Sequence, residues 1–239
     1  MFSIITRRFA IAAVLLSVFA VAACGDKEPE QRKTFIEYLQ KQVLSRKTAF
    51  VPFPNEKEKE SFGPYANHYQ VIVDFTNDME GTTGVLNKFQ ELTQKMRSLQ
   101  GIRDNWKSIE ELRKLIADKV MPEAEAQFNK AESERKLLKQ PDDLKVVYDQ
   151  AFEKTVTQPV EAFKAALPAM SKAMEAMEAL GRFLDENKDN ITLSGMSVQP
   201  KKESLQKPLQ DHLAAYNKAS VELLQAAKPL LEITGTSPR

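Results

Sequence analysis

The sequence is poor in the residue types that build covalent cross-links and reactive sites. Its 239 residues include one cysteine, two histidines, one tryptophan and eight scattered glycines. A single cysteine cannot form a disulfide within the chain, so packing alone must hold the fold. Few thiols and imidazoles leave few ligands for a transition metal, and scattered glycines form no loop that cradles phosphate. The sequence therefore predicts neither a metal site nor a cofactor.

The charge is balanced, which also limits the classes of partner. The chain has 34 basic and 33 acidic residues, and the two signs are interspersed without a long block of either. Proteins that bind nucleic acid carry a basic patch or stripe, and none is visible in this sequence. We therefore expect no nucleic-acid partner.

An apolar run near the amino terminus predicts export. Arg7 and Arg8 precede the run Phe9–Val21, and the small residues before Cys24 resemble a cleavage site. A cysteine directly after the small residues is typical of a lipoprotein signal. Residues 1–23 are thus predicted to be a signal peptide, with cleavage after Ala23 and a diacylglycerol on the Cys24 thiol.

Two other interpretations of this segment stay open. A signal that is cleaved without lipidation fits the same charges, and a retained membrane anchor would need about 20 apolar residues, whereas Phe9–Ala23 is shorter. Gly25 stands where an aspartate typically retains lipoproteins at the inner membrane. We therefore expect a lipid anchor in the outer membrane, facing the periplasm, rather than in the inner membrane, and residues 24–30 as a tether.

The rest of the chain has the period of helices. The pattern predicts a mostly α fold, an elongated bundle of long antiparallel helices, with one small β-hairpin near residues 191–198. Residues 31–233 are predicted to form a single helical domain, and 234–239 a loose tail. The spacing of apolar residues and the caps predict helices over Gln31–Ser45, Tyr65–Gln100, Ser108–Leu138 with a kink at Met121-Pro122, Asp142–Thr155, Pro159–Leu184 and Ser204–Leu230, with a connector at Gly101–Lys107.

Residues with catalytic potential are few. His68 and His212 are far apart in sequence and outside any metal-binding spacing, so we expect ordinary helix-surface residues. The adjacent acids Asp142 and Asp143 suit a helix start, where Asp142 can cap and the dipole favours negative charge. A hydrolase that uses these acids as a general acid/base pair is the alternative. The sequence favours a protein that is not an enzyme.

Methionines recur on the predicted helices and allow a second function. Their helical spacing indicates core positions, but methionine repacks easily and could line an adaptable apolar groove. The alternative function is then a carrier or chaperone that holds a lipid or peptide between helices. The methionines concerned are Met79, Met96, Met121, Met170, Met174 and Met177.

Several islands of the sequence resemble one family, the YiaF-like lipoproteins with the domain of unknown function 3053. The resemblance runs from Cys24 to about Thr157 and more loosely to the C-terminus, with departures at Gly25 and Pro141. It implies a Gram-negative envelope lipoprotein of uncharacterised function, and it brings no catalytic residues. The matching islands are Asp26-Lys27-Glu28, Gln31-Arg32-Lys33, Phe35-Ile36, Leu39-Gln40, Phe62-Gly63-Pro64, Leu138-Lys139-Gln140 and a dense motif from Asp142 to Thr157.

The dense motif places many polar side chains on one short helix. They could bond neighbouring helices and fix the bundle, or they could form a docking face for another envelope protein. The leading hypothesis is a non-catalytic interaction or scaffold module, held at the membrane by Cys24. The residues of this possible interaction face are Asp142, Asp143, Lys145, Asp149, Gln150 and Lys154.

Overall fold

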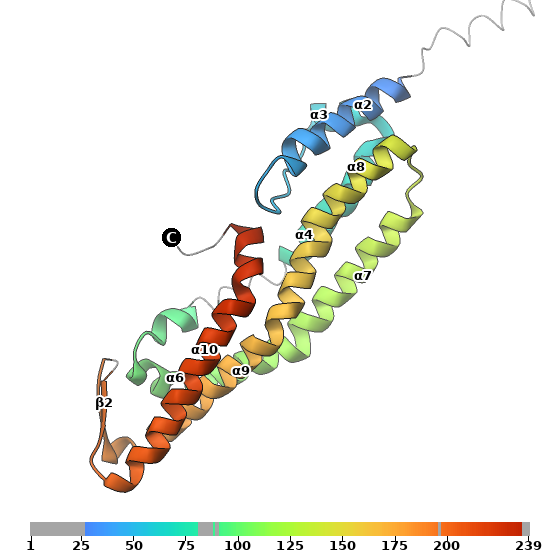
Figure 1. Cartoon of the computed structure of the whole chain (residues 1–239). Coiled ribbons are helices and arrows are strands. Elements are labelled where there is room, and N and C mark those ends of the chain that lie inside the picture. Colours follow the sequence, from blue (N-terminus) through green and yellow to red (C-terminus); the bar gives the residue numbers. More distant parts are fainter. Residues whose placement is uncertain (1–26, 81–87, 89–90, 196, 236–239) are drawn as a thin grey trace, which may run out of the picture.

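A computed structural model of the chain describes residues 27–80, 88, 91–195 and 197–235. The predicted signal peptide, its cleavage site and Cys24 lie outside the described residues. The predicted mostly helical, elongated architecture is confirmed, and Figure 1 shows long helices running side by side along the molecule. Among the described residues, no helix combines the length and apolar character needed to cross a bilayer.

Short helices pack at one end of the molecule. These are α2 (Glu28–Tyr38) with the π-helical η1 (Leu39–Leu44), α3 (Glu56–Phe62), η2 (Gly63–Tyr65) and α4 (Ala66–Glu80). Helix α2 begins at Glu28. The tether predicted over 24–30 is therefore too long, and the helix start predicted at Gln31 is three residues too late. Pro29 explains the difference, because proline suits the first turn of a helix. Asn55 and Glu58 form a capping box at the start of α3.

The middle of the chain differs from prediction. One helix was expected over Tyr65–Gln100 and a connector over Gly101–Lys107, but helix α6 (Leu99–Leu115) runs through that connector. The helix break falls at Met96–Ser98 instead. Ser98 caps α6, and its hydroxyl oxygen accepts a hydrogen bond from the Gly101 amide at 3.0 Å. The predicted capping serine, Ser108, lies inside the helix.

Two long continuous helices follow. The first joins α6, η3 (Ile116–Val120) and α7 (Met121–Leu137) into 39 residues, and the second joins α8 (Asp142–Phe152), η4 (Glu153–Thr157) and α9 (Gln158–Glu186) into 45. With a rise of 1.5 Å between successive residues they measure roughly 57 and 66 Å. A connection of four residues, 138–141, turns the chain between them, so they run antiparallel (Figure 1).

Prolines explain the π-helical turns in both long helices. The amide directly before Pro122 bonds back five residues to Ile116, and the amide before Pro159 bonds back five residues to Glu153. Proline cannot donate a hydrogen bond, and its ring clashes with the carbonyl four residues earlier. A widened π turn relieves that clash without ending the helix. Where a kink was predicted, at Met121-Pro122, the structure has a local change of helix type.

The chain ends with a hairpin and a last long helix. After η5 (Lys188–Asn190), strands β1 (Ile191–Ser194) and β2 (Ser197–Pro200) pair antiparallel, with Ile191 opposite Pro200, and the predicted hairpin is confirmed. Gly195 takes a positive φ of 62° in the tight turn, which glycine adopts without steric cost. Then η6 (Glu203–Leu205) leads into α10 (Gln206–Thr234), which packs along α9.

Buried side chains form three clusters along the body. The first, at the α2 end, is aromatic, and the other two are mainly aliphatic and lie around α6, α9 and the hairpin. Burial raises the pKa of Tyr38 and of Tyr65 to about 12. Both long helices supply residues to all three clusters. The largest fully buried side chains of the aromatic cluster are Phe35, Phe62, Tyr69, Tyr148 and Phe152.

A glycine permits close contact between α6 and α9. A Cβ atom added at Gly181 would lie 2.6 Å from the Cβ of Trp106 and 2.7 Å from the carbonyl oxygen of Ile102. Beside this contact, the indole Nε1 of Trp106 donates to Asp185 at 3.3 Å, and the guanidinium of Arg182 lies 5.0 Å from the indole centre. The two backbones are therefore too close for any larger residue at position 181.

We predict that Gly181→Ala destabilises the protein, although alanine is the better helix former. Overpacking typically costs about 1–3 kcal/mol, and here the new methyl meets backbone that cannot rotate away. Urea unfolding followed by the fluorescence of the only tryptophan measures the effect at the contact itself.

Ala179→Gly on the exposed face of the same helix is the matched control. It should cost only the helix propensity difference of about 1 kcal/mol. A Gly181→Ala variant as stable as the parent protein would contradict the close approach of α6 and α9.

Candidate functional site

The predicted interaction face lies on α8 and η4, and four of its six side chains make polar contacts within the described chain. The Asp149 carboxylate accepts hydrogen bonds from Arg135 of α7 at 2.8 Å and from Lys145 at 2.5 Å. Burial alone would raise the pKa of Asp149, but these two cations outweigh burial and hold that pKa below its ordinary value. Asp149 thus joins the two long helices near their connection.

Lys154 connects η4 to the end of η1, the helix that follows α2. Its ammonium donates to the carbonyl oxygens of Val43 at 3.1 Å and Leu44 at 3.0 Å, and also to that of Arg46. These carbonyls lie at the end of η1, where few backbone donors remain and where the helix dipole favours a cation. Burial lowers the pKa of Lys154. Lys154 therefore acts as a side-chain cap from a distant part of the sequence.

The two acids at the start of α8 have different surroundings. Asp143 lies 3.6 Å from Arg32 of α2 and accepts a hydrogen bond from the Leu144 amide at 2.9 Å. Asp142 was expected to cap α8, but Pro141 occupies the cap position and makes no side-chain bond. Asp142 and Gln150 are exposed to solvent. Of the six residues, these two alone keep an exposed side chain with no ion pair or hydrogen bond within the described part of the chain.

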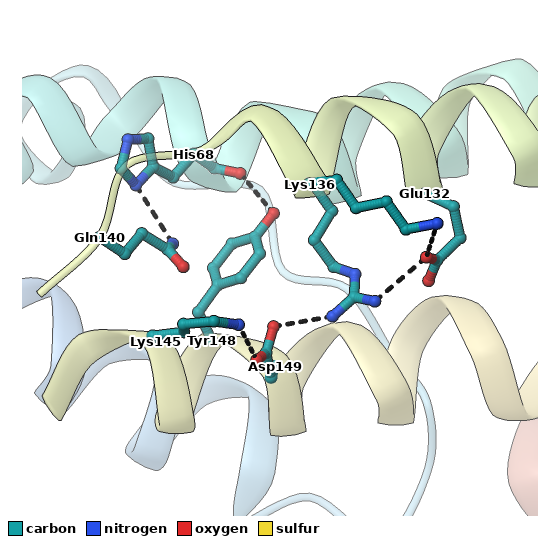
Figure 2. A network of polar contacts seen from close by, with 8 residues as sticks. His68, Glu132, Lys136, Gln140, Lys145, Tyr148 and Asp149 are labelled. Atoms are coloured by element: carbon teal, nitrogen blue, oxygen red, sulfur yellow. Dashed lines mark hydrogen bonds and ion pairs between the residues drawn. The ribbon is translucent and has the colours of Figure 1, made fainter. Parts of the chain in front are cut away.

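The sequence did not predict a polar network in which hydrogen bonds hold α8 and the α7–α8 connection against α4. Figure 2 shows the Tyr148 hydroxyl donating to the His68 carbonyl at 2.8 Å, and Gln140 within 3.2 Å of the His68 ring. His68, which was expected on the surface, is half-buried, and this burial lowers its pKa. Single residues of types that are common on surfaces gave no signal for such a network.

Arg135 is the centre of the network's charged part. Its guanidinium donates to Glu132 at 3.1 Å and to Asp149, and it lies 4.9 Å from the centre of the Phe152 ring. A planar guanidinium can serve two carboxylates and stack on a ring at the same time, which lysine cannot do. Arg135 therefore fixes the angle between α7 and α8.

The acids considered for hydrolysis do not share a cleft. Asp142 faces solvent, and the carboxylates of Asp143 and Asp149 bind separate cations. Beside them is a shallow concavity of about 250 Å³ lined by Arg135, Lys136, Leu138, Gln140 and Lys145. Among the residues that the structure describes, no three acidic, histidine or cysteine side chains gather as metal ligands. This geometry offers no pair of carboxylates poised for general acid/base work.

Most of the methionines pack together as part of the core. Met174 is buried in the middle cluster, and Met79 lies apart from the rest, against the aromatic cluster. Another concavity of about 250 Å³ is lined by residues of 88–95 and of α6, most of them polar, and no methionine is among them. The other methionines packed against the middle cluster are Met96, Met121, Met170 and Met177. The core interpretation of the methionines is the one that these contacts favour.

His212 is on α10, far from His68 in the fold as in the sequence. Its ring lies 4.8 Å from the Phe183 ring of α9, where it fills part of the α9–α10 contact. The two histidines therefore do not form a common site.

Comparison with known proteins gives a family match over most of the chain. The chain matches the family described as "Protein of unknown function (DUF3053)" over residues 12–231. The chain belongs to this family. It is 28% identical over 218 residues to "Uncharacterized protein YiaF" of Escherichia coli strain K12, covering 89% of this chain and 87% of that protein, and equally so to that of Shigella flexneri. No solved structure matches the chain.

We predict that Lys154→Met destabilises the aromatic end of the molecule. Methionine keeps the length of the side chain but leaves carbonyls at the end of η1 without their donor, which typically costs about 1–3 kcal/mol. Urea unfolding measures the loss, and hydrogen exchange should show faster exchange in residues 38–46.

Lys218→Met on exposed α10 is the matched control, because its ammonium lies 4.0 Å from a single exposed glutamate. It should change stability by less than about 0.5 kcal/mol. Equal effects of the two variants would show that Lys154 does not cap the first helix.

The ion pairs of Asp149 predict a dependence on pH. Because its folded pKa is lowered from the ordinary 3.8, its stabilisation is present above that value and is lost as the pH falls through the folded pKa. Asp149→Asn should therefore be less stable than the parent by about 1 kcal/mol at neutral pH, and the difference should close below about pH 4. Urea unfolding at several pH values measures both.

Asp142→Asn is the control for this prediction, since its side chain is exposed at the same helix. It should change stability by less than about 0.5 kcal/mol at either pH. A constant difference between Asp149→Asn and the parent at all pH values would contradict the charge-based account.

Proposed function

We propose that the protein is a lipid-anchored protein of the cell envelope that holds an elongated, non-catalytic scaffold at a membrane surface facing the periplasm. The observation that supports this most is where the described chain begins. Residue 27 lies at one end of the long body, and the predicted lipid attachment site, Cys24, is three residues before it (Figure 1). An anchor at the end of a rod would leave the rod's length free of the membrane.

Helix α2, the first described helix, is fixed to that end by specific contacts. The Tyr65 hydroxyl donates to the Glu28 carboxylate, and Arg32 lies 3.6 Å from Asp143 at the first turn of α8. Phe35, in the next turn of α2, is fully buried in the aromatic cluster. A tether that joined a loosely attached helix would transmit no orientation, whereas this helix is part of the core.

The predicted anchor is strong enough to hold the protein permanently. Each buried methylene contributes about 0.8 kcal/mol, and one acyl chain of moderate length binds only marginally. A diacylglycerol on Cys24, with a third chain on the new amino terminus, exceeds that threshold. Gly25 in place of aspartate supports the outer membrane as the destination.

The body's length suggests the purpose of such an anchor. The helix of 45 residues from Asp142 leads away from the anchored end to the hairpin β1–β2, roughly 66 Å distant. Exposed surface along and beyond this helix, including Asp142 and Gln150, would be presented to another envelope protein at a set height. We therefore favour an interaction or scaffold role, with an envelope protein as the partner.

The anchor is tested by labelling cells with palmitate and separating their membranes. The parent protein should carry label and fractionate with the outer membrane, whereas Cys24→Ser should be unlabelled. Gly25→Asp is the matched control: it should keep the label but move to the inner-membrane fraction.

The scaffold role is tested in the same cells with a photo-crosslinking residue at Gln150. A defined envelope protein should be captured by the parent and lost in the Cys24→Ser variant. An unlabelled parent protein would contradict the anchor, and a labelled protein that captures no envelope protein from Gln150 or from the hairpin would contradict the scaffold.

A further inference from the structure

The connection between α7 and α8 carries an unusual exposed leucine. Leu137, the last residue of α7, is 80% exposed, the most of any large apolar side chain in the described chain. Lys136 and Lys139 flank it, and both are exposed. Its neighbour Leu138 packs against the aromatic cluster, so the backbone beneath Leu137 is held in place. We call residues 136–139 the corner.

A series of contacts connects the corner to the first turn of α2. Gln140, next to the corner, is within 3.2 Å of the His68 ring, and that ring lies 5.2 Å from the Tyr65 ring. Tyr65 in turn donates to Glu28 in the first turn of α2. The corner and the first described residues therefore lie at the same end of the molecule, as Figure 1 shows.

Chain length limits how far this end can be from a lipid attached at Cys24. Three residues separate Cys24 from Lys27, and a fully extended chain reaches at most about 3.6 Å per residue. The start of α2 can therefore lie no more than about 11 Å from the acylated residue. The hairpin end of the body is much farther than this from the start of α2.

We propose that the corner rests on the lipid bilayer, with Leu137 inserted among the headgroups. This inference rests on the proposed lipid anchor and adds an orientation to it. An exposed apolar side chain between two lysines suits an interface, because the leucine leaves water while each lysine stem extends its ammonium to lipid phosphates. Asp142 is an exposed acid nearby, so insertion of the leucine, more than net charge, drives the contact.

The contact would give the body a defined orientation relative to the membrane. A lipid anchor alone lets the body pivot about the residues after Cys24. A second contact at the corner fixes the end of both long helices on the membrane at once, because the corner joins them. The hairpin end would then stand away from the bilayer instead of lying on it.

Site-specific labelling tests this, since the only natural cysteine, Cys24, is acylated in the lipidated protein. Full-length lipidated protein with Leu137→Cys is labelled with a fluorophore and reconstituted into vesicles of phosphatidylethanolamine and phosphatidylglycerol that carry nitroxide on the acyl chains. We expect at least a twofold quenching of the label.

Val221→Cys is the matched control, because Val221 is an apolar residue that is 54% exposed and lies in the middle of α10. The middle of α10 is away from the corner (Figure 1). The label at this position should be quenched little. Equal, weak quenching at both positions in protein that floats with the vesicles would overturn the corner contact while the anchor stands.

Two further outcomes are distinct. A shift in emission at position 137 without quenching would mean that a protein surface, such as a second copy of the chain, covers Leu137, and it would overturn the lipid contact. Protein that fails to float with vesicles, with Cys24 open to the same label, would show that the proposed anchor itself has failed.

Discussion

The fold depends on two continuous helices that run antiparallel past one another. Residues 99–137 and 142–186 each contribute to all three buried clusters, so these helices connect an aromatic end to a hairpin end. The first contains Pro122 and the second contains Pro159, and each helix accommodates that proline with a π-helical turn. The second helix also continues through Pro168, inside α9. One cysteine cannot form a disulfide within the chain, so packing alone holds the fold. The continuity of the two helices gives the body its length and stiffness.

Polar residues of α8 and η4 mainly serve this architecture. Asp149 and Arg135 fix the angle at the connection between the long helices, and Lys154 ends the first helix from outside it. The dense polar motif is thus explained in large part by packing, with Asp142 and Gln150 left on the surface.

Periodicity and capping predicted most of the helices and the hairpin, because these signals are local. Prediction failed where two local signals competed: Ser98 and Ser108 both resemble caps, and Gly101 suggested a connector, yet only Ser98 has its side chain at a helix start. The site was harder still. Lys154 meets carbonyls more than a hundred residues away, and His68 meets Gln140 across 72, so no sequence window could contain either contact. Gly181 could be recognised as special only with Trp106 beside it.

The central claim is that the chain from Asp142 to Glu186 is one uninterrupted helix that spans the body. Spin labels at Val146 and Glu186, both exposed, would measure it directly by pulsed electron resonance in protein whose Cys24 is acylated or replaced. Forty residues of helix predict a narrow distribution of distances centred at roughly 60 Å. A broad distribution, or one centred well below that distance, would mean that the helix bends or breaks at η4, and would contradict the account.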